Sequence, residues 1–460
     1  MPKVVSQIPE AKGHWILGHA RELRDGLLDT LVALYRTHGP VFQMRAMRRR
    51  FVVLAGAEAN NFVARHEAET MTTRHHYEWF GRELGSERFL LALSGEDHRV
   101  ARRILRPGYS KAHITRRLPT LCILAERTLG RFEPGPRRRP LDDVRRIVVD
   151  QIGLALGNRP AGHMVHDLER AISTLLRVTV SRSAPRALLW SPPFLLARAR
   201  MRNLVRTAIA EHGSGPPTDR PRDHIDDLLA ARTPDGEPLD PAFLEASAHG
   251  PFVAGLDTVA STLAIALFTL ARDRALRTAL EAEADALFAD GPPTAAAMRK
   301  ARLLHAALME TLRLYPVTPV VVRTTTCPIE FEGHRIPAGQ DLLVAHCVPH
   351  KLAEYFPDPE AFVPDRFLPP REEHRAQSGI YAPFAVGPHT CLGAGIADVL
   401  LLLDAAYILH RFEIAVPPNL AKLELRYDPV AMPRNLRLEI VRERHPPPPF
   451  VAAGAPEATA

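Results

Sequence analysis

The chain has 460 residues, of which 46% are hydrophobic and 24% charged; this is typical of a soluble globular protein and excludes a disordered or fibrous one. Its 59 Lys and Arg exceed its 52 Asp and Glu, giving a net charge of +7, which permits nucleic-acid binding. However, no helix-turn-helix, zinc finger or alternation of basic and aromatic residues accompanies this charge, so a solvated surface or the docking of an acidic protein explains it better. The four cysteines show no paired spacing, which argues against a disulfide framework or a zinc site.

The sequence gives no sign of export or membrane insertion. The first 20 residues lack an apolar core with a basic flank, so we expect no signal peptide. The most apolar stretch, residues 252–271, contains Gly255, Asp257 and Thr258, which are costly in lipid, and predicts a buried helix. We therefore expect a cytoplasmic protein without a transmembrane anchor.

The first quarter of the chain predicts a small helical and β-structured region. Residues 23–35 have the pattern of an amphipathic helix, and residues 40–44 and 51–54 predict a hairpin around a basic turn. Residues 57–66 predict another helix. Residues 71–95 are rich in aromatic side chains and are expected to be irregular, either lining a pocket or covering the core.

A further helix is predicted to open at residue 95, and His98 and Arg102 share one of its faces because they are four residues apart. Arg102 either makes a charge-assisted bond to a carboxylate or is one more solvated arginine of a basic helix. Its basic companions are expected to face outward and to offer a docking surface: Arg103, Arg106, Lys111, Arg116 and Arg117.

The middle of the chain is predicted to be mainly helical. Helices are expected over residues 118–132, 141–156, 163–179 and 195–211. The loop 181–194 interrupts them with prolines and an apolar segment around Trp190, and residues 212–222 read as a Pro/Gly connector.

Asp240 and Pro241 predict the start of a long helix that continues to Arg272, since they suit the N-cap and first helical positions. Its centre, residues 254–258, reads Ala-Gly-Leu-Asp-Thr. Glycine and threonine are weak helix formers, and the hydroxyl of Thr258 can bond to a carbonyl one turn earlier, so a local opening with room for a ligand is expected. The alternative is a kinked core helix with a paired aspartate.

Two charged motifs follow. Glu310 and Arg313 lie three residues apart on a helix predicted over residues 301–314, and Arg366 belongs to the segment Phe-Val-Pro-Asp-Arg-Phe about fifty residues later. Alone, a Glu-x-x-Arg pair is common on helix surfaces. Short strands are predicted at residues 320–323, 329–333, 341–344, 423–427 and 436–441.

Cys391 lies in a turn, Phe384 to Gly393, that is followed at once by a helix predicted over residues 396–412. Gly387 and Gly393 allow tight folding and close approach of a flat ligand. The N–H groups at the start of the helix would point at the sulfur and favour a thiolate, a good axial ligand for haem iron. The alternative is a buried free cysteine.

These motifs, in this order, resemble the cytochrome P450 superfamily of haem-thiolate monooxygenases. His389, Ala385 and His98 stand where the family more often has Arg, Gly and Trp. The resemblance implies a mainly α (α+β) fold with small sheets, in which haem b is buried between the long central helix and the cysteine loop. It also implies one catalytic domain over residues 1–442; residues 443–460, rich in Pro and Ala, are expected to be disordered.

The resemblance also implies roles for single residues. Cys391 would be the iron ligand, Asp257 would relay protons, and Thr258 would hydrogen-bond where oxygen binds. Glu310, Arg313 and Arg366 would form a buried charged cluster behind the haem. The residues expected at the haem itself, including partners of its propionates, are His98, Arg102, Arg323, His389, Phe384, Gly393 and Ala254.

The implied activity is insertion of one oxygen atom from O2 into an apolar small molecule, such as a terpenoid, steroid, polyketide or fatty acyl compound. Electrons would come from a ferredoxin-type or flavoprotein donor on the basic face, and loop 181–194 would be part of a lid or simply a surface loop. The candidate substrate-contacting residues are Phe80, Phe89, His249, Phe252, Val253, Val317, Val320, Val321 and Met432.

Three alternatives stay open. A haem-thiolate enzyme can run on peroxide or without oxygen, but the Asp257–Thr258 pair counts against this. The protein could bind haem without catalysing a reaction, in which case that pair would have no purpose. A nucleic-acid binder would contain no haem and would lose affinity steeply with salt.

Overall fold

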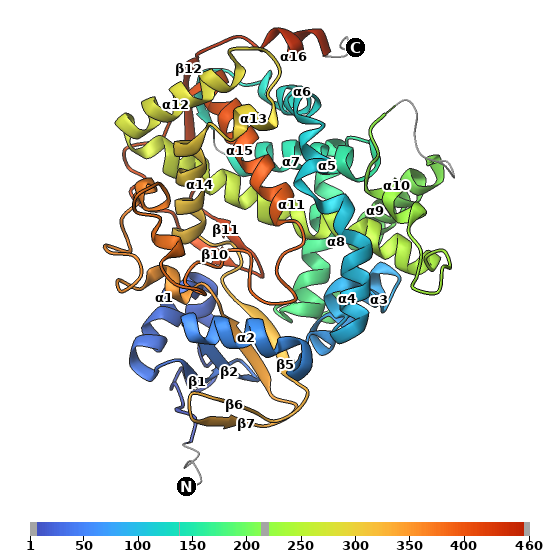
Figure 1. Ribbon diagram of the computed structural model, residues 1–460, viewed down its shortest axis with the longest axis vertical. Coiled ribbons are helices and arrows are strands. Elements are labelled where there is room, and N and C mark those ends of the chain that lie inside the picture. Colours follow the sequence, from blue (N-terminus) through green and yellow to red (C-terminus); the bar gives the residue numbers. More distant parts are fainter. Residues whose placement is uncertain (1–6, 138, 213–219, 455–460) are drawn as a thin grey trace.

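The computed structural model describes residues 7–137, 139–212 and 220–454. Helices make up most of the molecule, and the strands β1, β2 and β5 gather at the end near the N-terminus (Figure 1). The predicted mainly α architecture with small sheets is therefore confirmed.

The longest helix, α11 (Pro241–Arg272), forms the centre of the core. Asp240 caps it, since its side chain accepts hydrogen bonds from the backbone N–H groups of Ala242 and Phe243. The helix runs unbroken through residues 254–258, so the predicted local opening is absent. Gly255 instead allows close packing of the helix α7 (Pro140–Gly157), because a Cβ at this position would lie 2.6 Å from Ile152 Cδ1.

A five-stranded sheet joins distant parts of the chain, in the order β1-β2-β8-β5-β3. The strand β2 pairs in parallel with β8, so that Val52 lies opposite Leu342. β1 and β2 form the predicted hairpin. The strand bounds are β1 (Val41–Ala46), β2 (Arg49–Ala55), β3 (Met71–Thr72), β5 (Val321–Thr325) and β8 (Asp341–Ala345).

Three smaller sheets complete the β-structure: β10 with β11, β6 with β7, and β4-β12-β9. The β10–β11 hairpin contacts the central helix, and Ser261 of α11 donates a hydrogen bond to the carbonyl oxygen of Ala431. The bounds are β4 (Gly135–Arg137), β6 (Ile329–Phe331), β7 (His334–Ile336), β9 (Phe412–Ala415), β10 (Leu425–Tyr427), β11 (Ala431–Pro433) and β12 (Leu438–Glu443).

The remaining helices pack around α11 and the sheet. They are α1 (Ala20–His38), α2 (Ala57–Thr70), α3 (Arg74–Leu84), α4 (Gly95–Leu105), α5 (Lys111–Thr115), α6 (Leu118–Leu129), α8 (Val165–Leu175), α9 (Pro192–Glu211), α10 (His224–Ala230), α12 (Arg274–Phe288), α13 (Ala295–Met298), α14 (Arg302–Leu314), α15 (Ala394–Arg411) and α16 (Pro449–Gly454).

Residues 71–95 are not irregular as predicted, because they contain β3 and the helix α3. The buried face of α3 consists of His76, Phe80, Gly81 and Leu84, and a face containing His and Gly hides the apolar periodicity. Of the predicted connector 212–222, residues 213–219 lie outside the described residues.

The tail expected to be disordered from residue 443 is ordered as far as residue 454. Arg444 forms an ion pair with Asp285 of α12 at 2.7 Å. Val451 of α16 is only 1% exposed. The expectation was wrong for this segment because the prolines of residues 446–449 lead into a docked helix, and residues 455–460 lie outside the described part of the chain.

The loop 181–194 is tied to the β10–β11 hairpin through Asp428, which accepts a hydrogen bond from Ser183 at 2.5 Å and pairs with Arg177 at 3.2 Å. Within the loop Leu189 is buried, whereas Trp190 is 70% exposed and does not dock on neighbouring helices. The loop is thus held by the hairpin, by Leu189 in the core and by Arg186, which lies over the ring of Trp79 at 4.7 Å.

One helix of the described part of the chain, α11, is long and apolar enough to cross a membrane by length and composition. Its most apolar window is 78% buried inside the protein, as a core helix would be.

Candidate haem site

The cysteine loop is closed by backbone bonds around residues in the left-handed region. The N–H of Cys391 donates to the carbonyl of Phe384 at 2.9 Å, and that of Thr390 to Gly387 at 3.0 Å. Ala385 and Gly387 have φ angles of 63° and 75°. The chain therefore folds back on itself just before α15.

The backbone N–H groups of Gly393 and Ala394, at the start of α15, act on the sulfur of Cys391 and lower the pKa of its thiol. Burial raises the pKa of the Cys391 thiol, while these two N–H groups and the charge of Arg102 act in the opposite direction. Burial likewise raises the pKa values of Cys122 and Cys347, against which no such donors act. Of these three buried cysteines, Cys391 is thus the one best suited to carry a thiolate once a cation lies against it.

His98, Arg102 and His389 lie together next to the cysteine loop. The rings of His98 and His389 are stacked with centroids 3.8 Å apart. Burial lowers the pKa of His98 to about 3, so this ring is neutral at physiological pH. Burial also lowers the pKa of Arg102, and this half-buried side chain has no hydrogen bond or ion pair among the described residues, whereas its neighbours Arg103 and Arg106 are exposed to solvent.

A residue that the sequence analysis did not single out connects this group to Arg323. Glu67 of α2 is 1% exposed, forms an ion pair with Arg323, and lies 2.9 Å from Nδ1 of His389. Nothing in the local sequence distinguishes it from the neighbouring exposed Glu69. Only the pairing of distant strands brings β5, which carries Arg323, beside the end of α2.

On α11, Asp257 is buried and paired with Arg145 of α7 at 2.9 Å. Arg145 also pairs with Glu169 of α8 at 2.7 Å, and Glu169 reaches the surface with a third of its side chain exposed. Burial raises the pKa of Asp257, although Arg145 opposes this. Thr258 donates a hydrogen bond to the carbonyl of Ala254, the backward bond expected from the sequence.

Glu310, Arg313 and Arg366 meet in the core, each at most 1% exposed. Glu310 accepts from Arg313 at 2.6 and 2.9 Å and from Arg366 at 3.3 Å. Arg313 also donates to the carbonyls of His350 and Pro359 at 2.6 and 2.8 Å. The cluster therefore fixes the segment of chain that leads towards the cysteine loop.

Comparison with known proteins decides the family. The family model for cytochrome P450 matches residues 8–435, nearly the whole chain. The chain belongs to the cytochrome P450 family. Its membership accounts for the order of the motifs, from His98 to Cys391.

Curated cytochrome P450 relatives match over most of their length. The chain is 27% identical to cytochrome P450 139 of Mycobacterium tuberculosis (strain ATCC 25618 / H37Rv), covering 86% of this chain and 93% of that one. Identity to the sterol 14alpha-demethylase of Mycolicibacterium vanbaalenii is 26%, covering 90% and 93%. Identity to the cyclooctat-9-en-7-ol 5-monooxygenase of Streptomyces melanosporofaciens is 28%, covering 68% and 69%.

Solved cytochrome P450 structures share the fold. "Retinoic acid bound cyanobacterial CYP120A1" superposes with a TM-score of 0.81 at 24% identity, covering 95% of this chain and 99% of that one. "Crystal structure of cytochrome P450DA heme domain" gives 0.81 at 22% identity, covering 96% and 99%. The fold is therefore that of cytochrome P450, and the chain is a cytochrome P450 monooxygenase with a haem cofactor. Members of the family use O2 and a redox partner.

The site fits a haem group. None of residues 383–398 is fully buried, although the helix that follows is buried from Val399 onward. The surface of Cys391 is accessible, yet protein surrounds this residue closely enough for burial to raise the pKa of its thiol. The sulfur therefore faces a space inside the protein and not the outer surface. Ala254 on the otherwise buried α11 is exposed too. Arg102, which has no partner among the described residues, lies near Cys391 and suits a group that carries carboxylates.

The candidate substrate residues divide into two groups. Phe80, Phe89, His249 and Phe252 are at most 4% exposed, and the rings of Phe80 and Phe89 pack on each other at 5.5 Å. Nε2 of His249 is buried without a partner. Val253 and Val317 are buried as well, at 8% and 9% exposure. Only the side chains of Val320, Val321 and Met432 are partly accessible.

The basic surface near α4 and α5 is largely as expected. Arg103, Arg106, Lys111 and Arg116 are exposed, and Lys111 pairs with Asp398 of α15. Arg117 is the exception. It is 3% exposed and donates to Asn158 and to the carbonyl of Pro221, because it closes the junction between α5 and α10.

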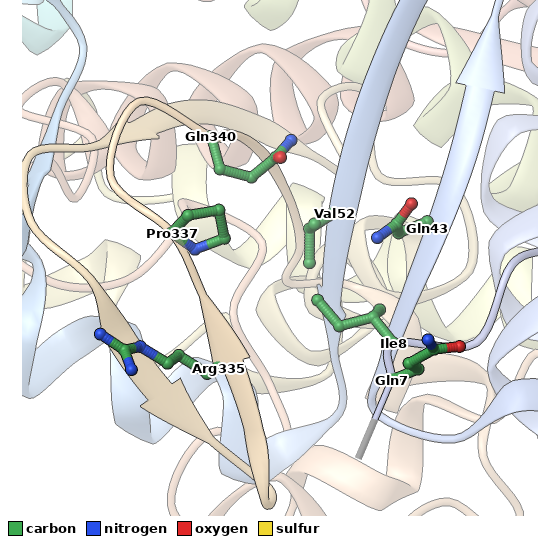
Figure 2. Close-up of a pocket in the computed structure, with 7 residues that line it drawn as sticks. All are labelled: Gln7, Ile8, Gln43, Val52, Arg335, Pro337 and Gln340. Atoms are coloured by element: carbon green, nitrogen blue, oxygen red, sulfur yellow. The ribbon is translucent and has the colours of Figure 1, made fainter. Parts of the chain in front are cut away.

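Two surface hollows lie away from these residues. One of about 310 Å³ lies between the N-terminal segment, the β1–β2 hairpin and the β6–β7 region (Figure 2), and is lined by Gln7, Ile8, Gln43, Val52, Arg335, Pro337 and Gln340. The other, of about 660 Å³, lies along α9 near Met164 and Leu204. Neither includes a residue of the candidate haem site.

Proposed function

We propose that Cys391 is the axial ligand of haem b and that the enzyme inserts one oxygen atom from O2 into an apolar small molecule. The observation that carries this proposal is the pair of N–H groups, from Gly393 and Ala394, that act on a cysteine sulfur facing an interior space. These donors stabilise negative charge on sulfur. Bound haem with a thiolate ligand supplies the activation of O2.

The residues around the loop would hold the carboxylates of the cofactor. Arg102 has no other partner among the described residues and lies close enough to Cys391 to act on its pKa. Arg323 and the neutral ring of His98 add donors on the same side. His389 stacks on His98 and keeps that ring in place.

On the opposite side, Asp257 and Thr258 would handle protons. Asp257 is held by Arg145, and Glu169 continues this chain of charges to the surface, so a proton can pass from solvent when the Asp257–Arg145 pair opens. The hydroxyl of Thr258 already donates to the carbonyl of Ala254, which leaves its oxygen free to accept a hydrogen bond from a water.

For the substrate we propose a terpenoid or steroid, with a polyketide or fatty acyl compound as further candidates. Two matched relatives are a sterol 14alpha-demethylase and a cyclooctat-9-en-7-ol 5-monooxygenase. The accessible side chains among the candidates, Val320, Val321 and Met432, are apolar. Nε2 of His249 is a buried, unpartnered group that could meet a polar atom of the substrate.

The electron donor would be a ferredoxin-type or flavin-containing protein with an acidic face. The exposed basic surface consists of Arg103, Arg106, Lys111 and Arg116. It borders the helix that follows the cysteine loop, since Lys111 pairs with Asp398 of α15. Such donors are soluble, which accords with a cytoplasmic location.

The test is the difference spectrum of the dithionite-reduced protein with and without carbon monoxide. A strongly red-shifted Soret band is expected, and it should vanish in Cys391→Ala but persist in Cys327→Ala, a change at a cysteine away from the loop. A Soret band at the ordinary position in the wild type would overturn thiolate ligation.

A further inference from the structure

Glu67 is a buried anion at the point where α2, β5 and the cysteine loop meet. Its side chain is 1% exposed. Burial alone would raise the pKa of its carboxyl, but the bond from His389 and the charge of Arg323 outweigh burial and lower that pKa, so the group is ionised. One oxygen, Oε2, has no hydrogen-bond partner.

This carboxylate holds two of the side chains proposed to lie at the haem carboxylates. Nε of Arg323 donates to Oε1 of Glu67, while its Nη1 donates to the carbonyl of Val322 at 2.8 Å. Nδ1 of His389 lies 2.9 Å from the same Oε1, and its Nε2 donates to the carbonyl of Leu93 at 2.9 Å. Nη2 of Arg323 thus makes no bond among the described residues, and the ring of His389 is bonded to Leu93 on one side and lies against Glu67 on the other.

The cysteine loop is shaped around Glu67 as well. A Cβ at Gly387 would lie 2.7 Å from Oε2 of Glu67 and 3.2 Å from Cα of Ala64. Gly387 also has a positive φ of 75°. The loop that carries Cys391 therefore approaches α2 as closely as it does only because this position has no side chain.

We propose that Glu67 is a positioning residue of the haem site, which fixes Arg323 and His389 and places a permanent negative charge beside the cofactor. This inference rests on the proposed function, in which those two side chains lie at the haem carboxylates. A fixed anion in a buried site favours the more positive ferric state over the ferrous one, because water screens it little. Glu67 therefore helps to set the reduction potential.

The experiment compares Glu67→Gln with Glu69→Gln in the haem-loaded protein. Both remove one negative charge from the same turn of α2, but Glu69 is exposed. E67Q is expected to raise the midpoint potential of the haem and to speed the loss of haem to apomyoglobin, whereas E69Q should change neither. The red-shifted band of the reduced carbon monoxide complex should persist in both, because Cys391 is unchanged.

The outcomes separate the two claims. If E67Q and E69Q have the same potential and the same rate of haem loss while the red-shifted band is present, the role of Glu67 is refuted and the proposed function stands. If the wild type lacks that band, thiolate ligation fails first. If circular dichroism shows that E67Q does not fold, Glu67→Asp decides, because it keeps the charge but shortens the side chain. Haem loss should then speed up while the potential stays near the wild-type value. A rate of haem loss equal to that of the wild type would refute the proposal.

Discussion

Ala385 has a left-handed backbone, with φ of 63°, in a loop whose geometry is set by the bonds of Cys391 to Phe384 and of Thr390 to Gly387. A Cβ in this region costs roughly 1 kcal/mol. Ala385→Gly is therefore expected to leave a free energy of unfolding about 1 kcal/mol higher than the same change at a position with ordinary φ, measured by urea denaturation of the haem-loaded protein.

The matched control is Ala376→Gly, an exposed alanine with φ of −60°. There the same change only adds freedom to the unfolded chain and should lower stability by about 0.5 to 1 kcal/mol. An equal loss of stability in both variants would mean that the loop stores no strain at Ala385.

Asp404 of α15 is a carboxyl buried at 1% exposure, with a single hydrogen bond from Gln151 at 2.6 Å. Burial raises its pKa to about 7. The folded state thus binds the proton of Asp404 more tightly than the unfolded state does. The stability that this proton binding contributes is fully present below the ordinary pKa of Asp and is lost as the pH rises through about 7.

Asp404→Asn removes this dependence. The variant should gain stability relative to the wild type between pH 5 and pH 8, by about 3 kcal/mol, in urea melts at the two pH values. Asp290→Asn, at an exposed position, controls for removing a carboxylate. If the free energies of unfolding of both variants change with pH as that of the wild type does, burial of Asp404 does not make stability depend on pH.

At the scale of elements, the α14 helix is bound to the chain before the cysteine loop through Glu310, since Arg313 and Arg366 share this one carboxylate. Removing it leaves the buried Arg313 without a counter-charge, while Arg366 keeps only Glu373, at 3.0 Å. Glu310→Gln should therefore destabilise the protein by about 3 to 5 kcal/mol and abolish most haem incorporation, measured as the ratio of Soret to protein absorbance.

Glu330→Gln on β6 is the control, because Glu330 is exposed. Equal haem content and equal urea midpoints for E310Q and E330Q would show that the cluster is dispensable.

The elements that the sequence predicted are those with a strong local signal. Asp240 and Pro241 mark the start of α11, and the apolar run after Cys391 marks α15. The helix α3 was missed because its buried face includes His76 and Gly81, and the opening expected in α11 was wrong because Gly255 makes room for Ile152 rather than for a ligand.

The strength of the local sequence signal also explains which residues of the candidate site could be predicted. Cys391, Asp257 and Arg313 stand in motifs that a local reading finds. The partners of Asp257 and Arg323, in contrast, come from other elements: Arg145 from α7 and Glu67 from α2. A glutamate on a helix carries no sign of the strand that will later lie beside it.

At the scale of the whole molecule, the positive charge is expected to act at the surface of Arg103, Arg106 and Lys111. Changing all three to Gln should weaken the binding of a [2Fe–2S] ferredoxin, used as the probe, by about tenfold at low salt and flatten the dependence of Kd on salt. Surface charges act in this way because salt screens them.

The control changes Lys12, Arg48 and Arg50 to Gln, three exposed cations near the N-terminal hairpin, far from α5 in Figure 1. It alters the net charge equally but should leave ferredoxin binding within about twofold of the wild type. Unchanged affinity and unchanged salt dependence in the first triple variant would refute the docking surface.

The pairing of β2 with β8 sets an order of events while the protein is being made. Val52 cannot pair with Leu342 until Leu342 has been synthesised. This edge of β2 therefore stays unpaired until translation has passed the end of β8 at Ala345. Arg323 can meet Glu67 only then, and Cys391 emerges later still. A growing chain that ends before Cys391 therefore lacks the complete candidate haem site, and the cofactor can be loaded only late in synthesis or after it.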